Sequence, residues 1–229
     1  MRAWGTALAA VAAEFPDEIL RLRERLRHVY WIGGGSGAGK STTAARLASE
    51  HGLRLYGTDE AMSDHARRTT AEQAPFLHRF MAMSMDERWV HRSPETMFAT
   101  FHWFRGEGFD LIVEDLLALP SDRGVVVEGF RLLPLLVQPL LATVDQAVWL
   151  LPTPEFRHAA IHGRPSPGPG FIHRTGDPER AGRNIAERDL LFTDRTRTQA
   201  RNLGLHVIEV DTTMAPDDTV RRVSNLFGL

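Results

Sequence analysis

The sequence predicts an α/β protein in which a parallel sheet of about five strands is covered by helices on both faces. Short apolar, β-prone runs alternate with segments of helical periodicity along the whole chain. The runs occupy residues 29–32, 53–56, 123–129, 147–151 and 205–210. Such alternation is typical of parallel sheets, which bind ligands at the carboxyl ends of their strands. Polar residues follow several of the runs, so we expect a binding site along that edge.

Length and composition limit the classes of function. The 229 residues suffice for one domain, or for one domain with an inserted lobe, and the hydrophobic content of 43% supports a full core. A net charge of −2 gives no reason to expect a nucleic acid or an acidic membrane as partner. The sequence has no cysteine, which excludes disulfides and thiolate metal sites. No stretch approaches the length of a membrane-spanning helix.

The N-terminus has some features of a secretory signal, because Arg2 precedes small apolar residues over 3–13. Gly5 and Thr6 interrupt that run. We therefore expect a cytoplasmic protein with an N-terminal helix, continued after Pro16 by an amphipathic helix over 19–27.

The first strand leads into the most specific motif of the chain, G-x-x-x-x-G-K-S. Its residues are Gly34, Gly35, Ser36, Gly37, Ala38, Gly39, Lys40 and Ser41. This is the pattern of a phosphate-binding loop, in which backbone N–H groups cradle phosphate at the start of a helix. Lys40, the only lysine of the chain, would reach the β- and γ-phosphates, and Ser41 would hold Mg²⁺. Thr42, the next residue of the predicted helix, completes the predicted nucleotide site.

The remaining elements follow in the order that the fold requires. Ser93 followed by Pro94 is a good helix start, since serine caps a helix and proline fits its first position. Further helices are predicted within 62–105 and over 109–119, 132–141, 181–203 and 217–227, with another beginning at 154. The segment 163–178 is rich in proline and glycine and is predicted to be a loop.

Taken in order, these features resemble the small-molecule kinase branch of the P-loop proteins. That branch contains adenylate, shikimate and gluconate kinases and chloramphenicol phosphotransferase. The resemblance covers most of the chain in layout, and its specific motif is the phosphate loop. It implies a P-loop NTPase fold, ATP and Mg²⁺ as cofactors, and a small-molecule acceptor, with residues 61–119 as the inserted acceptor-binding region.

Two carboxylates after predicted strands are candidates for the chemistry. By the resemblance, Asp59 lies where such kinases place an acid near the acceptor hydroxyl, and it would orient that oxygen or take its proton. Glu128 resembles the acid that holds the magnesium shell, usually through water, although glutamate stands here where adenylate kinases have aspartate. Asp64, one turn further along, and Glu128 itself remain alternative bases. Asp59 could also simply cap the following helix.

Arginines are dense between residues 157 and 201, and the resemblance implies an arginine-rich lid over 157–188. The arginines of this region are Arg157, Arg164, Arg174, Arg180, Arg183, Arg188, Arg195, Arg197 and Arg201. Arginines fold over the γ-phosphate in such kinases and neutralise charge during transfer. The resemblance places Arg157 near adenine and Arg164 at the entry of the lid, with a catalytic role. The alternative is a solvated basic helix with Glu187 and Asp194 as partners.

Other interpretations stay open. His158 and His162 have the spacing of metal ligands, but no nearby acidic pattern completes a zinc site. The stripe of Phe98, Phe101 and Phe104 is more typical of core than of an acceptor platform. A nucleoside monophosphate kinase would need several arginines in the inserted region, and a regulatory ATPase with a protein partner would need no acceptor. The sequence does not indicate the acceptor or the oligomeric state.

Overall fold

The computed structural model describes residues 16–157 and 170–229. Its five-stranded sheet has the order β2-β3-β1-β4-β5, and the neighbouring strands are all parallel. The strands are β1 (Val29–Gly34), β2 (Arg54–Gly57), β3 (Val125–Glu128), β4 (Ala147–Pro152) and β5 (His206–Val210). The predicted α/β fold with a parallel sheet is confirmed, and the predicted strands differ from the observed ones only at their ends.

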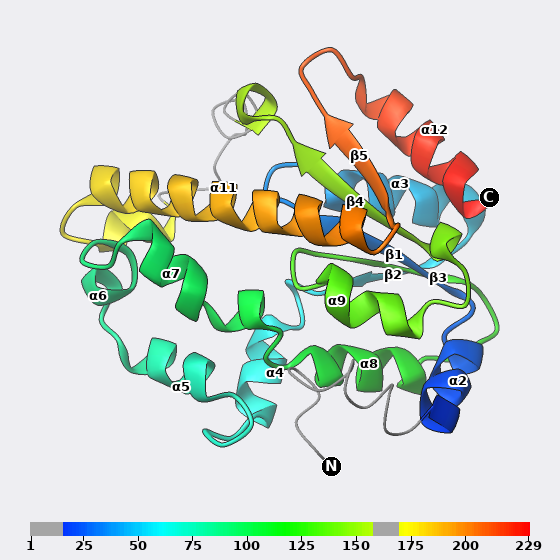
Figure 1. Ribbon diagram of the computed structural model, residues 1–229, viewed down its shortest axis with the longest axis horizontal. Helices are drawn as coiled ribbons and strands as arrows, with labels where there is room; N and C mark the ends of the chain where they lie inside the picture. Colours follow the sequence, from blue (N-terminus) through cyan, green and yellow to red (C-terminus); the bar gives the residue numbers. More distant parts are fainter. Residues whose placement is uncertain (1–15, 158–169) are drawn as a thin grey trace.

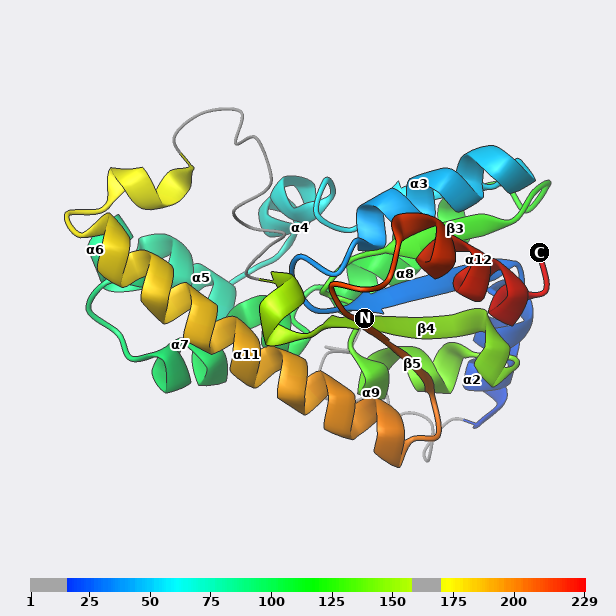
Figure 2. The ribbon, with the colours of Figure 1, turned by 90° about the horizontal axis from the view of Figure 1, so that it is seen from above.

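Helices cover both faces of the sheet (Figures 1 and 2). One face packs against α3 (Lys40–His51) and α12 (Pro216–Phe227). The other packs against α2 (Pro16–Arg25), α8 (Phe109–Ala118), α9 (Pro134–Val137) and α11 (Pro178–Asn202). In β4 the side chains alternate: Trp149 joins the core under α11, whereas Val148 and Leu150 join the core under α3. The central strands are therefore buried on both sides, which explains why they are apolar without interruption.

The segment between β2 and α8 forms a helical lobe at one end of the sheet (Figure 1). It consists of α4 (Met62–Arg68), α5 (Pro75–Ala82), α6 (Met85–Trp89), α7 (Pro94–Thr100) and the 3₁₀ helix η2 (His102–Arg105). Ser93 caps α7 as predicted, because its side chain accepts a hydrogen bond from the backbone N–H of Thr96. The lobe corresponds to the region in which we expected the acceptor wall.

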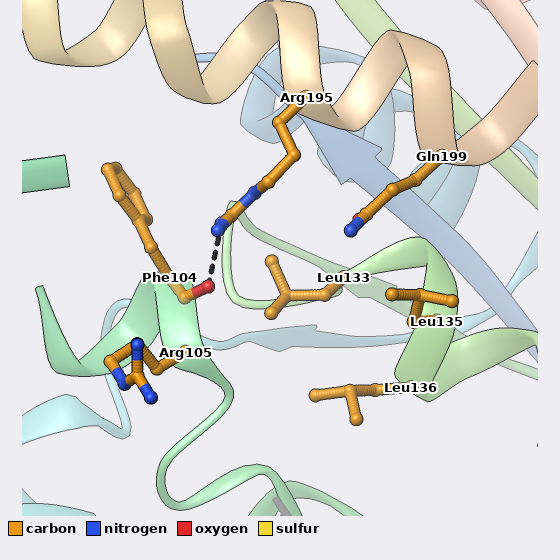
Figure 3. Close-up of a pocket in the computed structure, with 7 residues that line it drawn as sticks. All are labelled: Phe104, Arg105, Leu133, Leu135, Leu136, Arg195 and Gln199. Atoms are coloured by element: carbon orange, nitrogen blue, oxygen red, sulfur yellow. Dashed lines mark hydrogen bonds between the residues drawn. The ribbon is translucent and has the colours of Figure 1, made fainter. Parts of the chain in front are cut away.

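Helix α11 joins the lobe to the sheet, since it runs along both (Figures 1 and 2). In its C-terminal half, Arg195 donates a hydrogen bond of 2.6 Å to the carbonyl oxygen of Phe104 in η2. Figure 3 shows this contact beside Leu133 and Leu136, which lie at the start of α9 and within it. The same guanidinium lies 4.6 Å from the ring centroid of Phe98. Arg195 therefore fastens α11 to the lobe.

Three helices differ from the prediction in their extent: α2 spans Pro16–Arg25 where 19–27 was predicted, and the other two differ for identifiable reasons. The predicted helix over 132–141 is instead the short α9 followed by the 3₁₀ helix η3 (Gln138–Leu140), because Pro139 has no N–H to continue an α-helix. Helix α11 begins earlier than predicted, since the Asp177 side chain caps its first turn before Pro178. The short 3₁₀ helices η4 (Val144–Gln146) and η5 (Phe171–Arg174) complete the described elements.

Several predictions concern residues outside the described ranges. They are the N-terminal helix over 3–13, the histidines His158 and His162, Arg164, and the lid segment 163–169. The described part of the predicted lid forms η5 and the first turns of α11. In the part of the chain that the structure covers, no helix has both the length and the apolar character needed to cross a membrane.

Candidate functional site

The phosphate loop connects β1 to α3 in the predicted strand–loop–helix arrangement. Gly34 has a φ of 123°, and a Cβ at this position would lie 2.0 Å from the carbonyl oxygen of Leu150 in β4. Only glycine allows that close approach. Gly39, with a φ of 80°, has the left-handed helical conformation at the start of α3, but a Cβ there would meet nothing within 4 Å. The loop is thus closed against the sheet on one side and open beside the helix N-terminus, where an anion would bind.

Lys40 folds back over this loop. Its ammonium nitrogen Nζ donates a hydrogen bond of 2.8 Å to the carbonyl oxygen of Gly35, and the residue is only 8% exposed. The positive charge also stabilises the ionised forms of Asp59 and Glu128, lowering the pKa of each against the effect of burial. Lys40 therefore stands between the loop and the two carboxylates that the sequence singled out.

Strand register brings these carboxylates together. Glu128, the last residue of β3, pairs with Ile32 of β1 on one side and with Gly57 of β2 on the other. The backbone N–H of Thr58 donates a 2.9 Å hydrogen bond to the carbonyl oxygen of Glu128, so Asp59 follows directly at the same edge. The prediction that both acids lie beside the phosphate loop agrees with this geometry.

Glu128 is a candidate for holding a cation. It is 8% exposed, and burial raises the pKa of its carboxyl above the usual value, while Lys40 and a hydrogen bond from the Ser41 hydroxyl oppose that rise. The carboxylates of Asp59 and Glu60 raise it further. Glu128 and Ser41 thus bring two hard oxygen atoms together next to the loop, a donor set that suits Mg²⁺. Within 16–157 and 170–229 no group of three His, Asp or Glu side chains is arranged to ligate a metal, and Mg²⁺ bound with a nucleotide needs only one or two.

Asp59 lies two residues after the end of β2, and its carboxylate interacts with the charge of Lys40. The residue is exposed to solvent on one side, but neighbouring protein atoms crowd its carboxylate and raise its pKa, an effect that Lys40 and then Arg131 oppose. Asp64, the alternative base, is placed differently, because its carboxylate pairs with Arg67 and Arg68 on the surface of α4, each at 3.3 Å. The geometry thus favours Asp59 over Asp64 as the acid beside the phosphate loop.

Arg131, three residues after the end of β3, is buried and 2% exposed. Its guanidinium donates hydrogen bonds to the carbonyl oxygens of Thr58 (3.2 Å) and Gly108 (3.0 Å) and lies 4.0 Å from the ring centroid of Trp103. Burial lowers its pKa to about 10. Arg131 therefore fixes the chain on either side of the lobe, at Thr58 and at Gly108, to the segment that follows β3.

A cavity of about 290 Å³ lies between the lobe, α11 and the phosphate loop. Ser36 of the loop forms one edge of it. Aromatic rings form most of the wall, among them Phe80, Trp89, Phe101, Trp103, Phe130 and Phe192. Phe101 and Phe104 also belong to the packed core of the lobe and sheet, as the stripe predicted, but both line the cavity as well. The cavity opens beside the atoms that would hold the γ-phosphate.

The described arginines between residues 157 and 201 include two contrasting groups. Arg183, Arg197 and Arg201 form ion pairs on the exposed face of α11 or with β5, as expected for a solvated basic helix. Arg157 and Arg188 are buried and share Asp189: Arg157 Nη2 donates to one carboxylate oxygen at 2.9 Å, and Arg188 Nη2 to the other at 2.6 Å. Arg157 also donates to the carbonyl oxygen of Ala186 at 2.7 Å. Its predicted contact with adenine stays a prediction.

Sequence patterns did not single out Asp189 or His102, nor the position of Arg188 inside the cavity. Arg188 was one of nine arginines in a dense region, and nothing in its spacing separates it from the exposed ones. A helical wheel of α11 holds the available signal, because Ala181, Arg188 and Phe192 share one face at intervals of seven and four residues. An arginine on the apolar face of a helix is unusual and therefore indicates a buried role.

Comparison with known proteins gives one informative similarity. No family model matches the chain. The chain is 28% identical over 204 residues to a protein of Deinococcus radiodurans named adenylate kinase, and the match covers 83% of this chain and 91% of that protein. Together with the parallel sheet, this weak similarity indicates a P-loop kinase, without specifying the branch.

Proposed function

We propose that the chain is an ATP-dependent phosphotransferase that transfers the γ-phosphate of ATP to a hydroxyl group of a small molecule. The similarity to an adenylate kinase supports a phosphotransferase that uses ATP. The observation that carries the proposal is the position of the aromatic cavity, whose edge is Ser36 of the phosphate loop. An acceptor in that cavity would lie next to the phosphate that the loop binds.

Different residues of the chain bind the phosphates, hold the cation and accept the proton. The N–H groups of the loop and the Lys40 ammonium bind and orient the phosphates. Ser41 and Glu128 would hold Mg²⁺, which would neutralise charge on the phosphate oxygens when bound. Asp59 accepts a hydrogen bond from the acceptor hydroxyl and takes its proton as the new bond forms. The hydroxyl oxygen bonds to the γ-phosphorus, the bond to the β,γ-bridging oxygen breaks, and ADP leaves with that electron pair.

A nucleoside monophosphate kinase is the second candidate, because the similar protein is named adenylate kinase. Such an enzyme needs arginines around the acceptor phosphate. Six arginines of the lobe and its edge were candidates: Arg67, Arg68, Arg79, Arg88, Arg92 and Arg105. Each contacts atoms of the lobe or of α8: for example, Arg88 donates to the carbonyl oxygens of Phe80 and Met81, and Arg105 to that of Ala99. None of the six lines the aromatic cavity, as far as the described residues define it, which favours the first candidate.

The experiment compares acceptors at fixed ATP and Mg²⁺. ADP release is followed in a coupled assay with no acceptor, with AMP, CMP, GMP and UMP, and with a panel of small alcohols and phenols. We expect release that depends on a hydroxyl compound. Release that depends on a nucleoside monophosphate supports the second candidate, and ATP binding without any acceptor-dependent release contradicts both.

A further inference from the structure

The aromatic cavity contains one buried cation with an unused donor. Arg188 is 8% exposed, and its Nε and Nη2 both donate to the same carboxylate oxygen of Asp189, at 2.9 and 2.6 Å. The remaining terminal nitrogen, Nη1, is buried and has no hydrogen-bond partner among the described residues. A buried donor without a partner costs free energy, so an oxygen supplied by a ligand would relieve that cost.

The surroundings of Arg188 define which oxygen fits. Its guanidinium carbon lies 4.7 Å from the ring centroid of Phe101 and 5.4 Å from that of Trp89. The Asp189 carboxylate is shared with Arg157, so one negative charge faces two positive charges. This excess of positive charge disfavours a cationic ligand. One arginine, already paired with a carboxylate, also falls short of the arginine cluster that a dianionic phosphate requires.

In the part of the chain that the structure describes, His102 adds a second buried polar atom without a partner to a mainly aromatic wall. It is 3% exposed, and its Nδ1 is buried without a hydrogen-bond partner among the described residues. Burial, with the nearby charges of Arg131 and Arg188, lowers the pKa of its imidazole to about 3, so the ring is neutral at pH 7. The cavity therefore combines aromatic faces with the Arg188–Asp189 ion pair, the neutral imidazole of His102 and, at its edge, Ser36.

Its size limits the ligand as well. About 290 Å³ is at the small end of the range of sites that enclose small molecules, roughly 300–1,000 Å³. Ring faces on several sides favour a flat ligand that stacks against them.

We infer that, if the proposed phosphotransfer is correct, the acceptor is a flat, mainly apolar aryl alcohol without a phosphate group, whose carbonyl-type oxygen accepts a hydrogen bond from Arg188. The ring lies among the aromatic side chains, and the hydroxyl reaches toward Ser36 and Asp59. Transfer forms the bond from that hydroxyl oxygen to the γ-phosphorus and releases ADP, and the hydroxyl proton passes to Asp59. Arg188 binds the acceptor and sets specificity, whereas Asp59 takes part in the chemistry.

Two nearly isosteric probes test this assignment on the full chain. One is 4-acetylbenzyl alcohol, which carries a carbonyl oxygen, and the other is 4-isopropylbenzyl alcohol, which carries a methyl group in its place. Binding of each in the presence of ATP and Mg²⁺ is measured by titration with NMR detection. We expect the acetyl compound to bind about tenfold more tightly, as a hydrogen bond from a charged donor implies.

Variants identify the residue responsible. Arg188→Met should bring the two affinities to within about twofold of each other, because only the acetyl compound loses a partner. Arg183→Met is the matched control, since Arg183 lies on the same helix but is exposed and paired with Glu179. It should keep the wild-type preference. The comparison of the two probes on the wild-type chain needs no variant and is decisive even if Arg188→Met does not fold.

The outcomes separate this inference from the proposed function. Equal binding of the two probes, binding of neither, or ADP release stimulated more by AMP than by the acetyl compound overturns the acceptor assignment. Calorimetry of ATP binding tests the proposed function independently, because it involves the phosphate loop and not the cavity. If ATP binds and the probes show no preference, the acceptor class alone is wrong.

Discussion

Acid should destabilise the protein through His102, and the size of the effect follows from its environment. The imidazole lies against Phe101 and Trp103, with ring centroids 4.6 and 4.4 Å away, and its pKa is lowered from 6.5 to about 3, chiefly by burial. The unfolded chain therefore takes up a proton below pH 6.5 that the folded chain refuses. The contribution of the neutral His102 to the free energy of unfolding is fully present above pH 6.5 and is lost progressively as the pH falls toward 3. At pH 5 the loss is about 2 kcal/mol, from about 1.4 kcal/mol per unit over 1.5 units.

Urea denaturation at pH 7 and pH 5 measures this loss. From pH 7 to pH 5 the free energy of unfolding should decrease in both the wild type and His102→Phe. The decrease should be about 2 kcal/mol smaller in the variant, because the variant lacks the imidazole. Some pH dependence remains in the variant, because the pKa of His65 is also lowered, mainly by burial. His91→Gln, at an exposed position, serves as the control and should behave as the wild type. An identical pH dependence for His102→Phe and the wild type would refute the reasoning.

Three further substitutions test the site. Asp59→Asn should keep ATP binding but lower turnover by about 10²-fold, the usual effect of losing a positioned acid–base group. The control Asp64→Asn should change turnover little. Equal turnover for Asp59→Asn and the wild type would exclude Asp59 as the base. Glu128→Gln should raise the Mg²⁺ concentration for half-maximal turnover about tenfold, and an unchanged titration would contradict its role at the cation. Arg131→Met should lower the free energy of unfolding by about 3 kcal/mol in a denaturation experiment, because the carbonyl oxygens of Thr58 and Gly108 lose their donor, and a change below about 1 kcal/mol would show that they find another.

The fold could be predicted from the sequence because local signals agreed with one another. Apolar β-prone runs, the glycine loop after Ile32 and the Ser93–Pro94 helix start all have short-range physical causes. The edge that carries Lys40, Asp59 and Glu128 could also be predicted, since parallel strands end on one side of a sheet. That inference needs only parallel strands and does not depend on the order in which the strands lie in the sheet.

The cavity could not be predicted, because it depends on contacts between distant segments. Arg188 of α11 meets Trp89 of α6 and Phe101 at the end of α7, and no local pattern specifies how α11 crosses the lobe. The same holds for Arg131, which donates to the carbonyl oxygens of Thr58 and Gly108, residues far from it in the sequence. The sequence does not show whether a buried arginine has a structural role or a binding role. In both cases the guanidinium donates hydrogen bonds, and only the acceptor differs: a protein atom in the first case and a ligand atom in the second.

The central claim is that the loop from Gly34 to Ser41 binds the phosphates of ATP, and calorimetric titration of ATP with Mg²⁺ tests it most directly. Lys40→Ala should weaken binding about 100-fold, the loss expected for a charged contact, while its thermal unfolding stays close to that of the wild type. Lys40→Arg is the matched variant that keeps the charge, and it should also bind poorly, because a planar guanidinium does not fit between the β- and γ-phosphates as an ammonium does. Unchanged affinity of Lys40→Ala for ATP would contradict the assignment of the loop and the function built on it.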